Sequence, residues 1–153
     1  MNRKNIVPLT LFIFLILIAG CKDHGIEPLG STVYGTVVFE GEWPDNITNA
    51  FVVLAKDRPP DDALDLSYLV AFENIPFEEE PVSYDYEIQP DERGRYNWLF
   101  VAAIGNADSV DQRNVLTQYT EPDDPDEAGQ VVIENDNFYA GTLYVNFDEV
   151  YIP

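Results

Sequence analysis

The sequence predicts an all-β fold, a single antiparallel β-sandwich of seven to eight strands. Three observations support this prediction. Short apolar runs rich in Val, Tyr and Phe recur along residues 32–153. Turn-forming clusters of Gly, Pro, Asn and Asp separate these runs at short intervals. No convincing helical segment interrupts them. The predicted strands are residues 32–40, 50–56, 66–72, 82–88, 95–104, 115–119, 130–134 and 138–147.

The first three predicted strands differ in their apolar pattern. In residues 32–40 the odd-numbered positions form one face, which is apolar around a single glycine. Residues 50–56 (AFVVLAK) are an almost continuous apolar run and are expected to form the second strand. Residues 66–72 (LSYLVAF) are expected to form the third strand, with a short helix as the alternative because their apolar residues also fit helical spacing.

The later strands include the clearest alternation in the chain. Residues 82–88 alternate Val, Tyr, Tyr and Ile with Ser, Asp and Glu, which predicts a half-buried strand. Residues 90–94 (PDERG) have the composition of a turn. Residues 95–104 become apolar on both faces, which predicts a central strand with Trp98 in the core. The acidic, proline-containing residues 120–129 are expected to form a loop.

The N-terminal residues have the three parts of a secretory signal peptide. Arg3 and Lys4 give a positively charged start, and Ile6–Ile18 is apolar apart from one proline and one threonine. A transmembrane helix is the alternative. This run would rise only about 20 Å as a helix, however, whereas the hydrocarbon core of a bilayer is about 30 Å thick. Residues 1–20 are therefore predicted to be a signal peptide.

The signal closes on Leu17–Cys21 (LIAGC), which resembles the lipobox of bacterial lipoproteins. In this resemblance Ile18, Ala19 and Gly20 occupy the aliphatic and small-residue places that the signal peptidase recognises. The resemblance implies that Cys21 becomes the first residue of the mature chain and carries the lipid that anchors it. An ordinary cleaved signal with an incidental cysteine is the alternative.

The lipoprotein resemblance also implies a location in the bacterial cell envelope. Lys22 separates the cysteine from Asp23, so the chain lacks the directly following aspartate that retains lipoproteins at the inner membrane. We therefore expect the outer membrane, with the periplasmic and surface leaflets both open. Residues 21–31 would form the lipidated cysteine and a tether, and residues 32–153 the β-sandwich domain.

The composition of the mature chain excludes several classes of function. Six of the eight basic residues and all 28 acidic residues follow the signal, which gives a net charge of −22. Nucleic acid is excluded as a partner because phosphate binding needs a basic face. The single histidine is His24, in the tether, so the domain has no Ser-His-Asp triad, Cys-His pair or histidine zinc site. We therefore predict that the protein is not an enzyme.

One acidic loop is the best candidate for specific chemistry. Within Glu121–Glu127 (EPDDPDE), the oxygen-bearing residues Asp123, Asp124, Asp126 and Glu127 are of the type that Ca²⁺ prefers as ligands. The aspartate spacing and central glycine of an EF-hand are missing from this loop. A solvated acidic surface that aids solubility is the other interpretation.

A second candidate residue is Trp43, which lies in a predicted turn before Pro44. An exposed tryptophan in this position is suited to contact a ligand by stacking on a sugar ring or on a partner protein. The same residue is equally suited to cap one end of a β-sandwich.

Three segments resemble the transthyretin-like, carboxypeptidase-regulatory-like sandwich domains. Residues 33–44 (VYGTVVFEGEWP) and 50–56 resemble their opening strands, and Gly94–Tyr96 resembles their later Gly-x-Tyr turn into a strand. The resemblance implies a seven-stranded sandwich that serves as an accessory, binding or spacer module.

These observations predict a lipid-anchored envelope protein that acts as a non-enzymatic binding or structural module. It would attach to the membrane through the lipid at Cys21 and contact a protein or glycan partner. A Ca²⁺-dependent module that binds carbohydrate or protein is one alternative. A small glycoside hydrolase is a disfavoured alternative, because that chemistry needs two carboxylates held at a defined separation.

Overall fold

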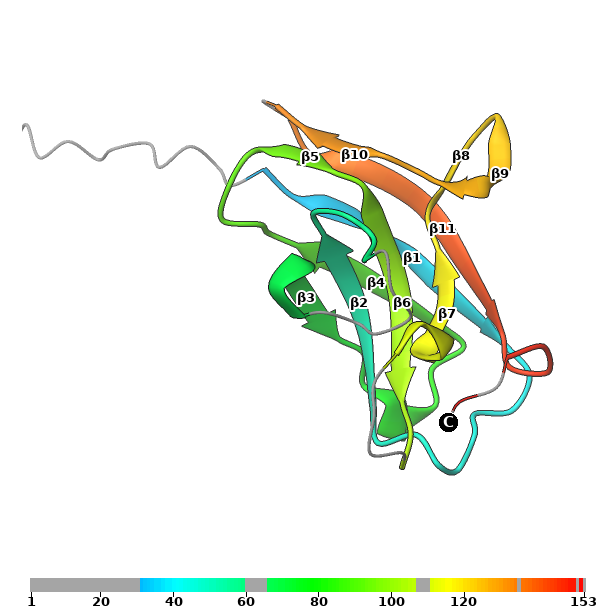
Figure 1. The fold of residues 1–153 in the computed structure, drawn as a ribbon. Helices are drawn as coiled ribbons and strands as arrows, with labels where there is room; N and C mark the ends of the chain where they lie inside the picture. Colours follow the sequence, from blue (N-terminus) through cyan, green and yellow to red (C-terminus); the bar gives the residue numbers. More distant parts are fainter. Residues whose placement is uncertain (1–30, 60–65, 107–110, 135, 151, 153) are drawn as a thin grey trace, which may run out of the picture.

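The computed structural model describes residues 31–59, 66–106, 111–134, 136–150 and 152 (Figure 1). It confirms the all-β class, because the described elements are strands and three-residue 3₁₀ helices. The strands are β1 (Val33–Glu40), β2 (Asn49–Ala55), β3 (Leu69–Asn74), β4 (Ser83–Ile88), β5 (Gly94–Tyr96), β6 (Trp98–Ile104), β7 (Val115–Gln118), β8 (Thr120–Glu121), β9 (Asp124–Ala128), β10 (Val131–Ile133) and β11 (Phe138–Asn146). The 3₁₀ helices are η2 (Leu66–Tyr68), η3 (Phe77–Glu79) and η4 (Gln112–Asn114).

Three strands form sheet A, in the order β11-β1-β4. Strand β1 pairs antiparallel with β4, as expected, but parallel with β11. The prediction of a purely antiparallel fold is therefore wrong at this pairing. Parallel strands need a long connection between them. The first and last strands have the intervening chain as that connection, so they can lie side by side in the same direction.

Four strands form sheet B, in the order β3-β2-β6-β7, and all of its pairings are antiparallel. Strand β6 lies between β2 and β7, which confirms the prediction of a central strand. Two smaller pairs, β10-β5 and β8-β9, complete the described sheets.

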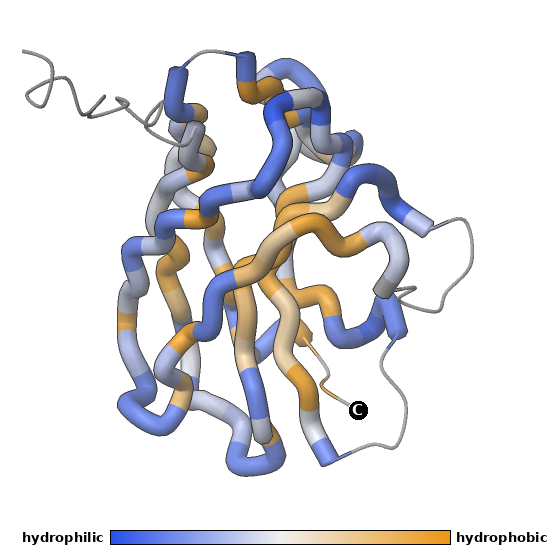
Figure 2. Tube along the Cα trace, turned by 90° about the vertical axis from the view of Figure 1, so that its left-hand side faces the viewer, coloured by the Kyte–Doolittle hydropathy of each residue, from blue (hydrophilic) through white to orange (hydrophobic). Residues whose placement is uncertain are grey.

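The main hydrophobic core receives side chains from both sheets, which lie on opposite sides of it (Figure 1). The odd-numbered face of β1 is buried, as its alternation predicts. Figure 2 shows hydrophobic stretches running through the strands, with hydrophilic residues gathered in the turns. Core residues with less than 2% exposure include Val33, Val37 and Val145 of sheet A, and Val52, Leu54, Leu99 and Val101 of sheet B.

A second buried cluster lies on the other face of sheet B. It contains Val53, Ala55, Trp98, Phe100 and Ala102. This explains why the sequences of β2 and β6 are apolar on both faces. Trp98 is 1% exposed, which confirms its predicted place in a hydrophobic core.

One carboxylate joins the edges of the two sheets. Glu73 of β3 accepts a hydrogen bond from the Tyr84 hydroxyl at 2.5 Å through Oε1. Its Oε2 accepts a second bond from the backbone N–H of Glu87 at 2.7 Å. Both donors lie on β4, so this side chain couples sheet B to sheet A.

Three predicted segments differ in detail from the structure. Residues 66–72 contain both alternatives, because η2 precedes β3. Residues 95–104 are divided at Asn97, where the chain leaves the β5–β10 pair and enters sheet B. Residues 120–129 are not a plain loop: β8 and β9 form a hairpin there, closed by the Gly129 N–H donating to the Tyr119 carbonyl at 2.8 Å.

The predicted signal peptide, Cys21 and most of the tether lie outside the described residues. Within the part that the structure describes, no helix has the length and hydrophobicity needed to cross a membrane.

Candidate functional site

The residues predicted to bind calcium lie on the β8–β9 hairpin. Asp123, Asp124 and Glu127 are exposed, and the side chain of Asp126 lies outside the described set. Glu121, which begins the acidic run, accepts a hydrogen bond from the backbone N–H of Gln130 at 2.9 Å. Among the described residues, no group of three Asp, Glu, His or Cys side chains is placed to hold a metal ion. The calcium site stays a prediction.

Trp43 is half-buried, and its contacts are those of a residue that caps one end of the core. Its ring centroid lies 4.6 Å from that of Phe39 and 4.7 Å from that of Phe147. Its Nε1–H donates to the Pro81 carbonyl at 3.2 Å. These packing contacts favour the capping interpretation over ligand contact.

Exposed tyrosines gather instead on the outer face of sheet A. Tyr34 of β1 is 41% exposed, while Tyr139 and Tyr144 of β11 are 61% and 63% exposed. Tyr34 and Tyr139 are direct neighbours in the parallel ladder. Their ring centroids lie 5.2 Å apart, with the ring planes tilted by 34°. We call Tyr34 and Tyr139 the tyrosine pair.

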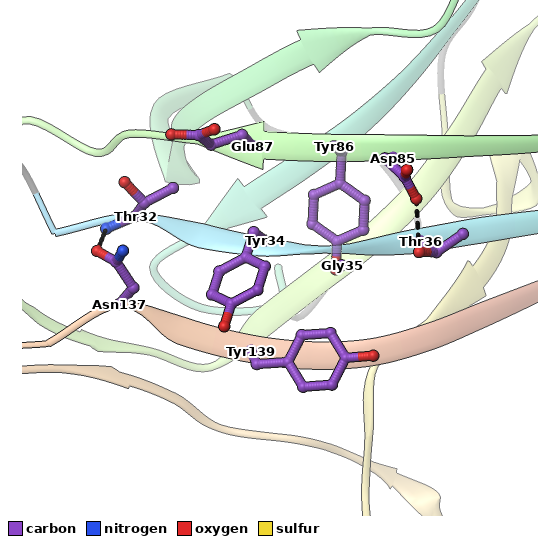
Figure 3. A pocket seen from close by; sticks show the side chains of 9 residues that line it. All are labelled: Thr32, Tyr34, Gly35, Thr36, Asp85, Tyr86, Glu87, Asn137 and Tyr139. Atoms are coloured by element: carbon purple, nitrogen blue, oxygen red, sulfur yellow. Dashed lines mark hydrogen bonds between the residues drawn. The ribbon is translucent and has the colours of Figure 1, made fainter.

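The tyrosine pair borders a groove of about 550 Å³. Figure 3 shows the side chains along it. Asp85 points into this region from β4 and is held by a hydrogen bond from the Thr36 hydroxyl to its Oδ1 at 2.7 Å. At the other end, Asn137 Oδ1 accepts from the Thr32 backbone N–H at 3.0 Å. The lining residues are Thr32, Tyr34, Gly35, Thr36, Asp85, Tyr86, Glu87, Asn137 and Tyr139.

A β-bulge in β11 places Tyr139 on this face. The register shifts between Tyr34 and Thr36 of β1, which pair with Tyr139 and Thr142. Gly141 sits in the extra space with a φ of +74°, a conformation that favours glycine. Side chains alternate between the two faces of a regular strand. Without the bulge, Tyr139 would therefore share the inward face of Leu143.

The strand beneath the groove is closely packed around Gly35. A Cβ atom at this position would lie 2.6 Å from the Gly141 carbonyl oxygen and 2.7 Å from the Tyr86 hydroxyl. The Tyr86 ring therefore extends from β4 to β1 only because residue 35 has no side chain (Figure 3). The hydroxyl of Tyr86 is buried and has no hydrogen-bond partner among the described residues. Burial raises the pKa of Tyr86 well above its usual value.

The described strands of sheets A and B lack basic residues, and carboxylates lie on the outer face of sheet A. The three strands of sheet A contain no Lys or Arg. Two carboxylates, Asp85 and Glu87, line the groove. The basic residues of the described chain all lie in other segments; they are Lys56, Arg58, Arg93, Arg95 and Arg113. The groove is therefore aromatic and anionic.

Comparison with family models, curated proteins and solved structures finds no match to this chain. The site is therefore interpreted from its own geometry and chemistry.

Proposed function

We propose that this is a lipid-anchored protein of the bacterial cell envelope whose domain, a β-sandwich built on sheets A and B, is a non-enzymatic binding module. The observation that supports a binding role is the tyrosine pair beside the groove on sheet A. Exposed tyrosines give a large, rigid contact surface that loses little conformational entropy on binding. Polar groups beside them fix the orientation of a ligand.

The anchor is proposed from the lipobox-like Leu17–Cys21, with the outer membrane as the location. Two or more acyl chains on one residue hold a protein firmly to a bilayer. The tether of residues 21–31 would then keep the domain close to the membrane.

A binding role suits the groove better than hydrolysis does. Asp85 and Glu87 are exposed and follow one another on the outer side of the same strand. Glycoside hydrolysis needs two carboxylates that face each other across the scissile bond, one of them with a pKa raised by its environment. This pair has neither the opposed placement nor the burial.

The anchor is tested by labelling growing cells with an alkyne analogue of palmitate. We expect the full-length protein to be labelled and to partition into detergent, and Cys21→Ser to lose both properties. An unlabelled wild-type protein would refute the anchor.

The binding surface is tested separately, by cross-linking the full-length protein in envelope preparations. A Tyr34→Ser/Tyr139→Ser variant should lose its cross-linked partner. Tyr144→Ser is the matched control, since Tyr144 is as exposed as Tyr139 on the same sheet but does not line the groove. Equal cross-linking by all three proteins would refute the tyrosine pair as the binding surface.

A further inference from the structure

We propose that the groove beside the tyrosine pair binds an arginine side chain from a basic segment of a partner protein. This inference rests on the proposed function, in which the tyrosine pair is the binding surface. It adds the chemical class of the ligand. Three features of the groove support it: its charge, its exposed rings and the way its carboxylate is held.

The charge of the groove selects a cationic ligand. Its lining contains Asp85 and Glu87 and no basic side chain. The strands that form it carry no Lys or Arg. The mature chain has a net charge of −22, so approaching cations are attracted and anions repelled over the whole surface. Complementary charge of this kind speeds encounter and rejects partners of the wrong sign.

The exposed rings select a cation with a flat, weakly hydrated head. A guanidinium stacks on aromatic faces, and its attraction to the ring adds to the attraction of nearby carboxylates. The two rings are 5.2 Å apart and tilted by 34°, and both are substantially exposed, so faces of the tyrosine pair remain open to a ligand.

The carboxylate of Asp85 is oriented for such a ligand. The Thr36 hydroxyl donates to its Oδ1, which fixes the side chain and leaves Oδ2 for a donor from outside. Arginine presents several N–H donors in a rigid plane, so one guanidinium can stack on a ring and donate to a carboxylate together.

The protein already contains a contact of this type. The guanidinium carbon of Arg58 lies 5.6 Å from the Trp98 ring centroid. The same guanidinium donates a hydrogen bond from Nη2 to Gln112 Oε1 at 2.7 Å. The groove on sheet A offers an aromatic face and an oxygen acceptor in the same combination, and no arginine lines it among the described residues.

The test uses the full-length protein in a non-ionic detergent and a fluorescein-labelled peptide of alternating Arg and Gly. Fluorescence anisotropy at about 150 mM NaCl reports the Kd, because salt at this level screens exposed charges beyond about 8 Å. The control peptide replaces Arg with citrulline, which keeps the shape and removes the charge. We expect the Arg peptide to bind at least tenfold more tightly than the citrulline peptide, about the factor that one well-placed cation–π contact provides.

Two double variants separate the groove from general charge attraction. Asp85→Asn/Glu87→Gln removes two charges from the groove, and Asp123→Asn/Asp124→Asn removes two charges from the β8–β9 hairpin. We expect the first to raise the Kd about tenfold, because its carboxylates would contact the guanidinium directly, and the second to leave it within about twofold, because its carboxylates lie outside the groove. Equal effects of the two would overturn the proposal.

The tyrosine pair is tested without any change of charge. Tyr34→Ser/Tyr139→Ser should raise the Kd about tenfold, and Tyr144→Ser should not. Tyr34→Leu/Tyr139→Leu is the second variant, which keeps apolar bulk and removes the rings; an unchanged melting temperature shows that the variant has folded. Wild-type affinity in both folded pair variants would overturn the proposal.

One further outcome separates this inference from the proposed function. Loss of the cross-linked partner in the Tyr34→Ser/Tyr139→Ser variant, together with no preference for Arg over citrulline, would overturn the arginine assignment and leave the binding role standing. Binding of a neutral probe such as cellohexaose, in place of the Arg peptide, would have the same meaning and assign the groove to sugars. Unchanged cross-linking in the Tyr34→Ser/Tyr139→Ser variant would overturn both the arginine assignment and the proposed binding role of the tyrosine pair.

Discussion

The replacement of Tyr86 by Phe should stabilise the protein. The Tyr86 side chain is 2% exposed, and its hydroxyl has no hydrogen-bond partner among the described residues. In water this hydroxyl donates and accepts hydrogen bonds, so folding removes it from favourable contacts. The hydroxyl lies against Gly35, so little room remains for a side chain to move toward it.

The size of the effect follows from two opposing contributions. An unsatisfied buried polar group costs about 1–3 kcal/mol. Removal of one oxygen atom leaves a small void, which reduces the gain because lost packing costs about 24 cal/mol per Å³ of cavity. We expect Tyr86→Phe to raise the free energy of unfolding by about 1 kcal/mol, which for a domain of this size is about 3–5 °C in Tm.

A matched control lies two residues away on the same strand. Tyr84→Phe removes a hydroxyl that donates to Glu73 at 2.5 Å, so it should destabilise the protein by about 1 kcal/mol or more. Both variants are measured by urea unfolding at neutral pH, with the full-length wild type as reference. A Tyr86→Phe variant that loses stability as Tyr84→Phe does would show that the Tyr86 hydroxyl has a bonding partner, and would refute the reasoning.

Four further predictions concern pH, salt, the bulge and calcium. Burial and then the hydrogen bond to Glu73 raise the pKa of Tyr84 to about 12 from 10.0. Its contribution to stability is therefore complete below pH 10 and is lost as pH rises toward 12. The free energy of unfolding in urea should fall between about pH 9 and about pH 11, and this fall should be smaller in Tyr84→Phe than in wild type. Self-repulsion of the acidic chain should make Tm higher at about 500 mM than at about 10 mM NaCl, and an unchanged Tm would contradict this. Gly141→Ala should cost about 1–2 kcal/mol in urea unfolding because φ is positive there, while Gly141→Asn should cost less; equal costs would argue against backbone strain. The calcium hypothesis predicts a saturable rise in Tm with millimolar CaCl₂ that MgCl₂ does not reproduce and that Asp124→Asn removes.

Hydrophobic patterning predicted the strands that bury the most surface. Residues 50–56 and 95–104 were recognisable because both of their faces are apolar, and each face of sheet B carries its own buried cluster. The alternation in residues 82–88 correctly placed Tyr86 and Ile88 inward, but Val82, which precedes β4, is 79% exposed. These predictions succeed because burial requires apolar side chains at a fixed period, which local sequence records directly.

The groove was not predictable in the same way. Its tyrosine pair depends on parallel pairing between the first and last strands, and no local signal specifies which strands become neighbours. Simple alternation back from Leu143 would also place Tyr139 in the core, and only the bulge at Gly141 turns it outward. An isolated glycine inside a strand pattern is the one signal that indicates a bulge. For Trp43 the turn position left ligand contact and capping both open, and its packing against Phe39 and Phe147 favours capping.

The position of the groove ties ligand binding to the folding of the whole domain. Its walls come from β1, β4 and β11, so a ligand that spans them contacts the first and last strands of the described fold together. Those two strands are held together by their ladder, by backbone hydrogen bonds that flank it and by side-chain contacts such as the tyrosine pair. A ligand that binds the folded state alone stabilises it in proportion to the logarithm of its concentration above the Kd. A bound ligand should therefore stabilise the parallel pairing of β11 with β1, which joins the last described strand to the first.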